Sequence, residues 1–262
     1  MRGHVGLGDA AALALVDERL QRRVALVGLV LVYVSWQANA TALGLLGLGA
    51  AAALWWLLRQ APPAGRSTHK ATAHDQVGSR SGLAALIATG TLDSGVRMGF
   101  LTFLPFLLQG KGATTAQIGL ALTLLFIGGA FGKLFCGYLG ARLGPVRTVV
   151  CTELLTAALI LVALLLPYLP LMLVMPLIGV ALNGTSSVLT GLVPDFAGRE
   201  QRDRVFACFY TGTVGGGALA PVLIGAISDH TGVEQGLMAL AGTLLLTLPL
   251  CLIVHTGLPR RQ

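Results

Sequence analysis

Two opposite charges stand four residues apart in an apolar stretch of this sequence. Asp93 and Arg97 lie near the middle of residues 82–108, and this spacing places both side chains on one face of a helix. In a bilayer, a charge at that depth costs about 3 kcal/mol on insertion scales, so each residue needs a reason to be there. One hypothesis is a cavity-lining carboxylate that exchanges a proton or binds a cationic group, held by the arginine. The alternative is a structural ion pair, or an arginine that interacts with another helix.

Other polar groups interrupt the later apolar stretches. Asn183 opens the polar run 183–187, and Tyr210 precedes a stretch rich in glycine. Small polar groups in an apolar helix either bond to a neighbouring helix or line a water-filled path. With both alternatives open, Asn183 and Tyr210 follow Asp93 and Arg97 as candidates for handling substrate or protons.

A second pair of opposite charges lies at the ends of two consecutive apolar stretches. Lys133 is near the end of one, and Glu153 is near the start of the next. If the two side chains meet across the turn between the stretches, they latch two helix ends at the cytoplasmic surface. The alternative is that each side chain extends separately to the membrane surface.

The composition is that of an integral membrane protein. Of 262 residues, 55% are hydrophobic and only 11% are charged, whereas soluble domains carry about 25% charged residues. Disorder, a collagenous repeat and a disulfide scaffold are excluded. The net charge of +7 indicates basic cytoplasmic loops in such a protein, so we expect the lipid bilayer, and no nucleic acid, as a partner.

No motif of an enzyme, metal site or cofactor site competes with this interpretation. The sequence has no Gly-x-Ser-x-Gly, no His-Glu-x-x-His and no phosphate-binding loop, so we expect neither catalysis nor ATP hydrolysis. The cysteines show no Cys-x-x-Cys spacing and are expected to be packing residues: Cys136, Cys151, Cys208 and Cys251. We therefore predict no catalytic residue, no metal and no cofactor, and transport energy would come from a gradient.

Apolar windows long enough to cross a bilayer need about 20 residues, and glycine and proline separate several of them. Six follow residue 82, at 82–108, 117–136, 148–167, 170–191, 205–227 and 233–255. Upstream, residues 24–58 are nearly uncharged but are interrupted by polar residues at 35–39, which predicts a transmembrane hairpin.

The predicted fold is an all-α polytopic membrane protein of about eight transmembrane helices. It divides into an N-terminal segment 1–58, a cytoplasmic linker 59–81 and a six-helix bundle 82–262.

Basic residues alternate between the connections. Eleven lie in the linker, in every second connection and in the C-terminal tail, and the remaining connections hold one, Lys111. Because cytoplasmic loops collect lysine and arginine, this pattern predicts a multi-pass protein of the inner (plasma) membrane with a cytoplasmic C-terminus.

Residues 137–147, Gly-Tyr-Leu-Gly-Ala-Arg-Leu-Gly-Pro-Val-Arg, contain a recognisable loop pattern. They resemble the Gly-x-Leu-Ala-Asp-Arg-x-Gly-Arg-Lys signature of the major facilitator superfamily. The residues that match in register are Gly137, Leu139, Arg142 and Gly144, while Ala141 replaces the aspartate and Pro145 the next basic residue. The resemblance implies a gating loop carried by Gly137, Arg142 and Gly144, with Arg147 as a nearby cation outside the register.

The architecture of residues 24–262 extends this resemblance. It is similar to the fifth and sixth helices, central loop and C-terminal half of such a transporter, whose complete form has twelve spans in two halves. The resemblance implies a secondary active, proton-coupled transporter of a small molecule that works by alternating access and lacks its first four helices. Its partner would be a second copy or a missing N-terminal half. The alternative function is a non-transporting membrane scaffold or an inactive transporter fragment.

Overall fold

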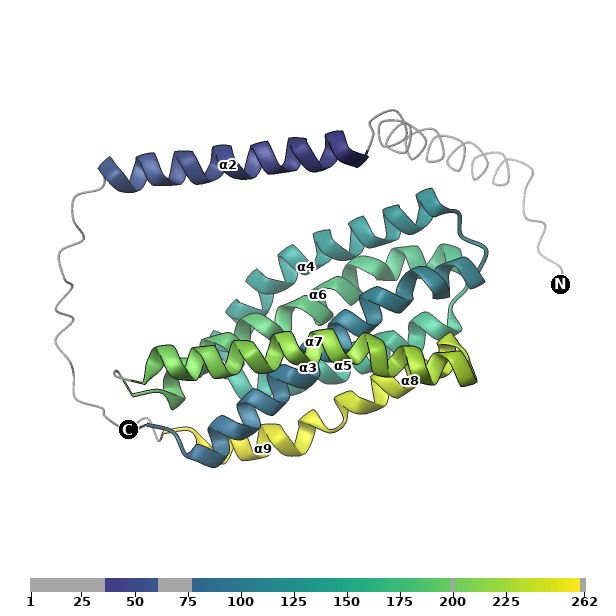
Figure 1. The fold of residues 1–262 in the computed structure, drawn as a ribbon. Coiled ribbons are helices and arrows are strands. Elements are labelled where there is room, and N and C mark those ends of the chain that lie inside the picture. Colours follow the sequence, from purple (N-terminus) through teal and green to yellow (C-terminus); the bar gives the residue numbers. More distant parts are fainter. Residues whose placement is uncertain (1–35, 61–76, 199–200, 260–262) are drawn as a thin grey trace, which may run out of the picture. The chain divides into compact units, whose positions relative to one another are not determined.

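In the computed structural model the described part of the chain is built of α-helices, and short connections join those from α3 onward (Figure 1). The structure describes residues 36–60, 77–198 and 201–259, and no strand occurs within these ranges. The chain divides into two compact units, residues 1–74 and residues 75–262. The first contributes one described helix and the second contributes the bundle.

Helix α2 of the first unit, Trp36–Gln60, is uninterrupted. The prediction of a hairpin turn is therefore wrong for residues 36–39, which are helical. These residues include neither glycine nor proline, so their polarity alone does not end a helix. Arg59 lies in the last turn of the helix, and its guanidinium is 4.9 Å from the centre of the Trp55 ring. Residues 1–35 and 61–76, which include the first arm of the predicted hairpin and most of the predicted linker, lie outside the described residues.

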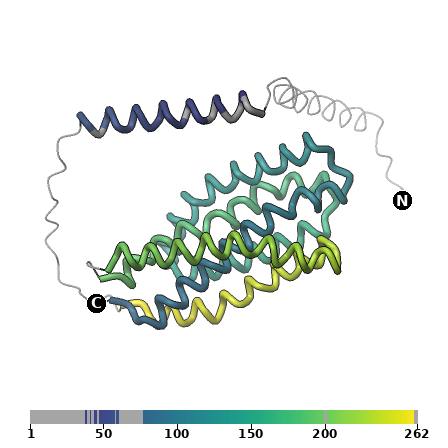
Figure 2. The backbone as a smooth tube through the Cα atoms, viewed as in Figure 1, coloured from purple at the N-terminus to yellow at the C-terminus, as the bar shows by residue number. Residues whose placement is uncertain are grey.

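The second unit follows the predicted spans closely. Its helices are α3 (Arg80–Gly110), α4 (Thr115–Leu143), α5 (Pro145–Leu165), α6 (Tyr168–Leu192), α7 (Arg202–Thr231), α8 (Val233–Leu244) and α9 (Thr247–Gly257), with the short 3-10 helix η1 (Val193–Phe196) after α6. Figure 2 shows that α8 leads directly into α9, so the last predicted span is one crossing with a break. Pro249 explains the break, because its ring clashes with the carbonyl group four residues earlier, that of Leu245.

Local signals in the sequence set the helix ends. The Ser79 hydroxyl accepts a hydrogen bond from the Gly82 amide at the start of α3, and Thr114 and Gln117 form a reciprocal capping box at the start of α4. Gly144 alone connects α4 to α5, with a φ of +88° that favours glycine, and Pro145 is the first residue of α5.

Within the described residues, five helical segments are long and apolar enough to cross a membrane. They are Thr115–Leu143, Pro145–Leu165, Tyr168–Phe196, Arg202–Thr231 and Val233–Gly257. Helix α3 has 31 residues but is not among these five, and it carries Asp93 and Arg97 in its interior. The all-α membrane fold is therefore confirmed, while the total of about eight transmembrane helices stays a prediction.

Hydrogen bonds between connections show which helix ends lie together at each end of the bundle. At one end, the amides of Gly78 and Ser79 donate to the carbonyl groups of Asp195 and Gly257, so the start of α3 meets the ends of η1 and α9. At the other end, Lys111 Nζ donates to two carbonyl groups at the end of α5, each at 2.8 Å. Lys111 is the one basic residue in the connections that were predicted to lie opposite the cytoplasmic side. Its ammonium group thus caps the C-terminus of α5.

Glycines allow α4 and α6 to pack closely. Gly128 and Gly132 of α4 lie against the backbone of α6 at Pro176 and Val180, and a Cβ at Gly132 would be 2.5 Å from the Val180 carbonyl oxygen. Gly179 of α6 lies equally close to the backbone of α4. Small residues spaced by four bring two helix backbones together, which is how helices associate in lipid.

Helices α3 and α7 form a second close pair. Gly212 and Gly216 of α7 lie against Thr91 of α3, and Gly217 lies against Ser94. The glycine-rich part of α7 is therefore used for packing at these positions, while Gly215 faces open space.

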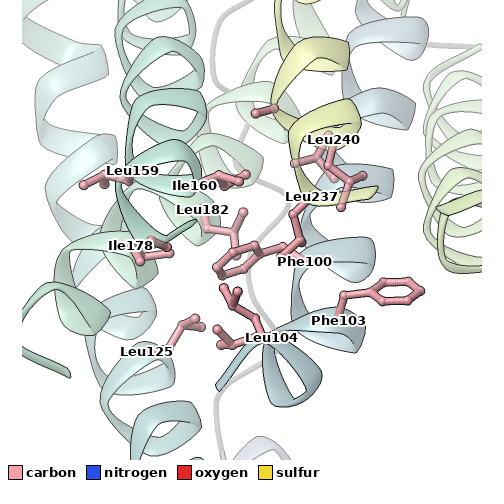
Figure 3. Packing of buried hydrophobic residues seen from close by; sticks show 14 of the residues in the cluster. Phe100, Phe103, Leu104, Leu125, Leu159, Ile160, Ile178, Leu182, Leu237 and Leu240 are labelled. Atoms are coloured by element: carbon pink, nitrogen blue, oxygen red, sulfur yellow. The ribbon is translucent and has the colours of Figure 1, made fainter. Parts of the chain in front are cut away.

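Two apolar clusters fill the bundle at different levels. The first joins Phe100 and Leu104 of α3 to side chains of α4, α5, α6, α7 and α8, and Figure 3 shows many of these side chains converging. The second includes Leu86 of α3 and Phe209 of α7, together with residues of α4, α5, α6 and α9.

Along α3, α5, α6 and α9, buried polar residues lie between the two clusters. We call them the polar layer: Thr89, Asp93, Ser94, Thr152, Glu153, Thr156, Thr185 and Thr247.

We predict that Gly132→Ala destabilises the bundle by about 1–3 kcal/mol, because its methyl group would overlap the α6 backbone. The measurement is the free energy of unfolding in mild detergent. Gly119→Ala is the matched control, since a Cβ there meets nothing within 4 Å. Equal stability of the two variants would contradict close packing of α4 on α6.

Candidate functional site

The predicted pair on α3 forms within the polar layer. Arg97 Nη2 lies 3.9 Å from Asp93 Oδ2, and the same nitrogen donates to Ser94 Oγ at 3.4 Å. Asp93 is 6% exposed, so its carboxylate sits almost entirely inside the bundle. Helical spacing of four explains the pairing, and Arg97, which is more exposed than Asp93, extends outward from the same face.

A second carboxylate lies close to this pair. Glu153 of α5 is 1% exposed, and its Oε1 atom has no hydrogen-bond partner among the described residues. Its carboxylate is near enough to Asp93 and Arg97 to interact electrostatically with both. A buried charge is costly unless it is paired, so two carboxylates here depend on one guanidinium.

The hydroxyl groups of the polar layer are satisfied within the protein. Thr89 and Thr156 each donate to a carbonyl group one turn earlier in their own helix, at 2.8 Å. Thr185 of α6 donates to Thr152 Oγ1 of α5 at 2.9 Å, which ties these two helices together beside Glu153. The hydroxyls therefore hold the layer together and leave the charged groups as its reactive members.

A cavity of about 260 Å³ opens beside the Asp93–Arg97 pair. Four helices supply its walls: α3, α4, α6 and α7. The lining residues are Gly90, Asp93, Arg97, Lys133, Ser186, Leu189, Thr190, Phe209, Tyr210 and Thr213. The two close helix pairs thus place one acidic side chain, two basic side chains and several hydroxyl groups around a common space.

Of the other two substrate candidates, the structure brings one to the cavity. Tyr210 lines it and is 51% exposed, with its ring 6.0 Å from that of Phe209 in an edge-to-face arrangement. Asn183 is not among the lining residues. It packs against α4 instead, where a Cβ on Gly129 would be 2.6 Å from its Nδ2 atom.

The predicted latch between Lys133 and Glu153 is wrong for the described structure. Lys133 is exposed and lines the cavity, whereas Glu153 is buried in the polar layer and no ion pair joins them in the described ranges. The prediction failed because it considered only the distance along the chain. The angular position of each residue on its helix turns the two side chains in different directions.

The proposed gating residues surround the connection between α4 and α5. Most of the expected loop is helical, because α4 extends to Leu143 and α5 starts at Pro145. Gly144 makes the turn, and the Arg142 guanidinium lies 4.7 Å from the centre of the Tyr138 ring. Gly137 lies inside α4 and faces open space, so no close contact requires it, and Arg147 is exposed in the first turn of α5. Their part in gating stays a prediction.

Sequence reasoning missed several cavity residues. Ser186 and Thr190 of α6, and Phe209 and Thr213 of α7, carry no motif that separates them from ordinary helix residues. The signal that was present is their spacing, since residues four apart share a helix face. Which face of α6 or α7 lines the cavity depends on the positions of the neighbouring helices, and the sequence does not give these positions.

Comparisons with known proteins give matches to the bundle. The sequence model of the Major Facilitator Superfamily matches residues 86–262. A solved structure described as an auto-inhibited POT family peptide transporter aligns with 69% of this chain at a TM-score of 0.60 and 17% sequence identity. The chain spans 38% of that transporter's length. The search of curated proteins finds no match.

We predict that Asp93 and Arg97 are energetically coupled. Arg97→Gln should be more destabilising than the double variant Asp93→Asn/Arg97→Gln, because the single change leaves a buried carboxylate without its cation. A coupling energy of about 1–3 kcal/mol is expected from unfolding in mild detergent. Additive effects would show that the two side chains do not depend on each other.

Proposed function

Because this chain belongs to the major facilitator superfamily, we propose that its bundle forms half of the pathway of a proton-coupled secondary transporter for a small molecule. The observation that carries the proposal is the position of the Asp93–Arg97 pair, in the wall of a cavity between α3, α4, α6 and α7. A gradient would supply the energy, and the end of the bundle that holds Arg80 and Arg147 would face the cytoplasm.

Charge balance in the polar layer supports proton coupling. Arg97 can neutralise one carboxylate, while Asp93 and Glu153 both interact with it. The buried group is therefore neutral overall when one of the two carboxyl groups carries a proton. Asp93 lines the cavity and Glu153 does not, so we assign proton exchange with the aqueous path to Asp93 and an internal role to Glu153.

The cavity needs a second wall for alternating access. In this superfamily the pathway lies between two related halves, and the chain spans 38% of the solved transporter that it matches. We propose that the other wall comes from a second copy of this chain or from an N-terminal half. Exposed apolar side chains on α4 and α7, among them Phe131, Leu134 and Val214, are available to lipid or to such a partner.

The test is substrate-driven proton flux into liposomes that contain the purified chain, read with an internal pH-sensitive dye. Organic acids, amino acids, dipeptides and sugars serve as the panel of probes. We predict that Asp93→Asn abolishes any flux that the unmodified chain supports, because the amide cannot release a proton. Asp203→Asn, at an exposed position in the first turn of α7, is the matched control and should retain the flux.

Two outcomes would change the account. Flux that is undiminished in Asp93→Asn would remove Asp93 from the mechanism. A stable chain that gives no flux with any probe, measured together with its oligomeric state, would favour the non-transporting scaffold or inactive fragment.

A further inference from the structure

The cavity contains one cation more than it has carboxylates. Arg97 of α3 and Lys133 of α4 are its basic residues, and Asp93 is its acidic residue. Asp93 lies in ion-pair distance of Arg97, at 3.9 Å. No carboxylate within the described ranges forms an ion pair with Lys133, so its ammonium group is the unbalanced charge of the cavity.

Lys133 brings its charge to the cavity from the side of α4. It stands within a helix that is long and apolar enough to cross the membrane, beside the exposed side chains of Leu134 and Phe135. A lysine within such a helix usually pairs with an anion or faces a water-filled space. Here it faces the cavity, and the protein itself supplies no described anion for it.

The other polar groups of the cavity are mostly committed to the backbone. Ser186, Thr190 and Thr213 each donate their hydroxyl proton to a carbonyl group of their own helix. The donors that remain for a ligand are the Lys133 ammonium, the free edge of the Arg97 guanidinium and the Tyr210 hydroxyl, which makes no hydrogen bond within the described chain. These three donors can bind an acceptor group of a ligand.

We propose that this cavity binds a small monocarboxylate anion, with its carboxylate between Lys133 and Arg97. Its apolar body would contact Phe209, Tyr210 and Leu189, which line the same cavity. One negative charge brings the three charged side chains to balance, whereas a cationic substrate would add to the excess. The volume of about 260 Å³ suits a compact ligand. This assignment rests on the transport proposal and names its substrate class.

The experiment measures binding, separately from transport. Benzoate, benzamide and benzylamine share one ring and differ in the charge of the polar group, so they are titrated into the purified 262-residue chain while its Tm is recorded. Propanoate and propanamide serve as a smaller pair. A ligand that binds the folded state raises Tm with its concentration. We expect the two carboxylates to raise Tm by several degrees and the amides and the amine to leave it unchanged.

Variants then assign the effect to the cavity. Lys133→Gln should weaken the apparent affinity for benzoate by about 10-fold to 100-fold, as expected for a lost charge-assisted hydrogen bond. Arg204→Gln removes the same charge from an exposed position at the start of α7 and should bind like the unmodified chain. Lys133→Arg, which keeps the cation, should retain benzoate binding, and the Tm of each unliganded variant checks its folding.

The results separate this proposal from the transport proposal. Stabilisation by benzamide or benzylamine equal to that by benzoate, or equal affinity of Lys133→Gln and Arg204→Gln, would overturn the anion site. Benzoate binding that depends on Lys133, in a chain that gives no proton flux in liposomes, would support the anion site and contradict the transport proposal.

Discussion

Burial of charge at mid-bundle is the constraint on which the rest of this structure depends. Apolar clusters lie on both sides of the polar layer, and a bilayer offers no water at that depth to pair with Asp93, Arg97 or Glu153. These groups must balance one another or reach an aqueous space. The cavity provides that space for Asp93 and Arg97, while Glu153 stays behind them in the protein interior.

Close helix packing creates the cavity at this level. Glycine brings α4 onto α6 and α7 onto α3, and the four helices of these two pairs are the ones that line the cavity. Contacts of this kind rest on shape and not on side-chain polarity, so each pair can behave as a rigid unit.

Much of the bundle could be predicted because its signals are local. Hydropathy, glycine and proline located the helices from α3 to α9 closely, except that α4 extends to Leu143, beyond its predicted end at residue 136. The spacing of four between Asp93 and Arg97 predicted their pairing, which the structure confirms. The break between α8 and α9 was not predicted, although Pro249 marks it. Pro249 lies in a continuous apolar stretch, and the high hydropathy of that stretch predicted a single unbroken helix.

The direction in which a side chain points could not be predicted from distance along the chain. Lys133 and Glu153 are near in sequence to a common turn, but one faces the cavity and the other the bundle interior. Asn183 is as polar as the cavity residues, yet it faces Gly129 of α4. Neighbouring helices decide these orientations, and the amino-acid pattern of a single helix does not contain them.

The central claim is that this cavity is an aqueous space inside a membrane-embedded bundle. The most direct measurement is labelling of single cysteines by a charged, membrane-impermeant thiol reagent, in the chain reconstituted in liposomes with its four native cysteines replaced by alanine. Thr213→Cys lies in the cavity wall, and Leu155→Cys lies on an exposed face of α5 close in sequence to Glu153. The account predicts rapid labelling at position 213 and little at 155, because exposure at 155 is to lipid. Equal labelling of the two, or none at 213, would contradict it.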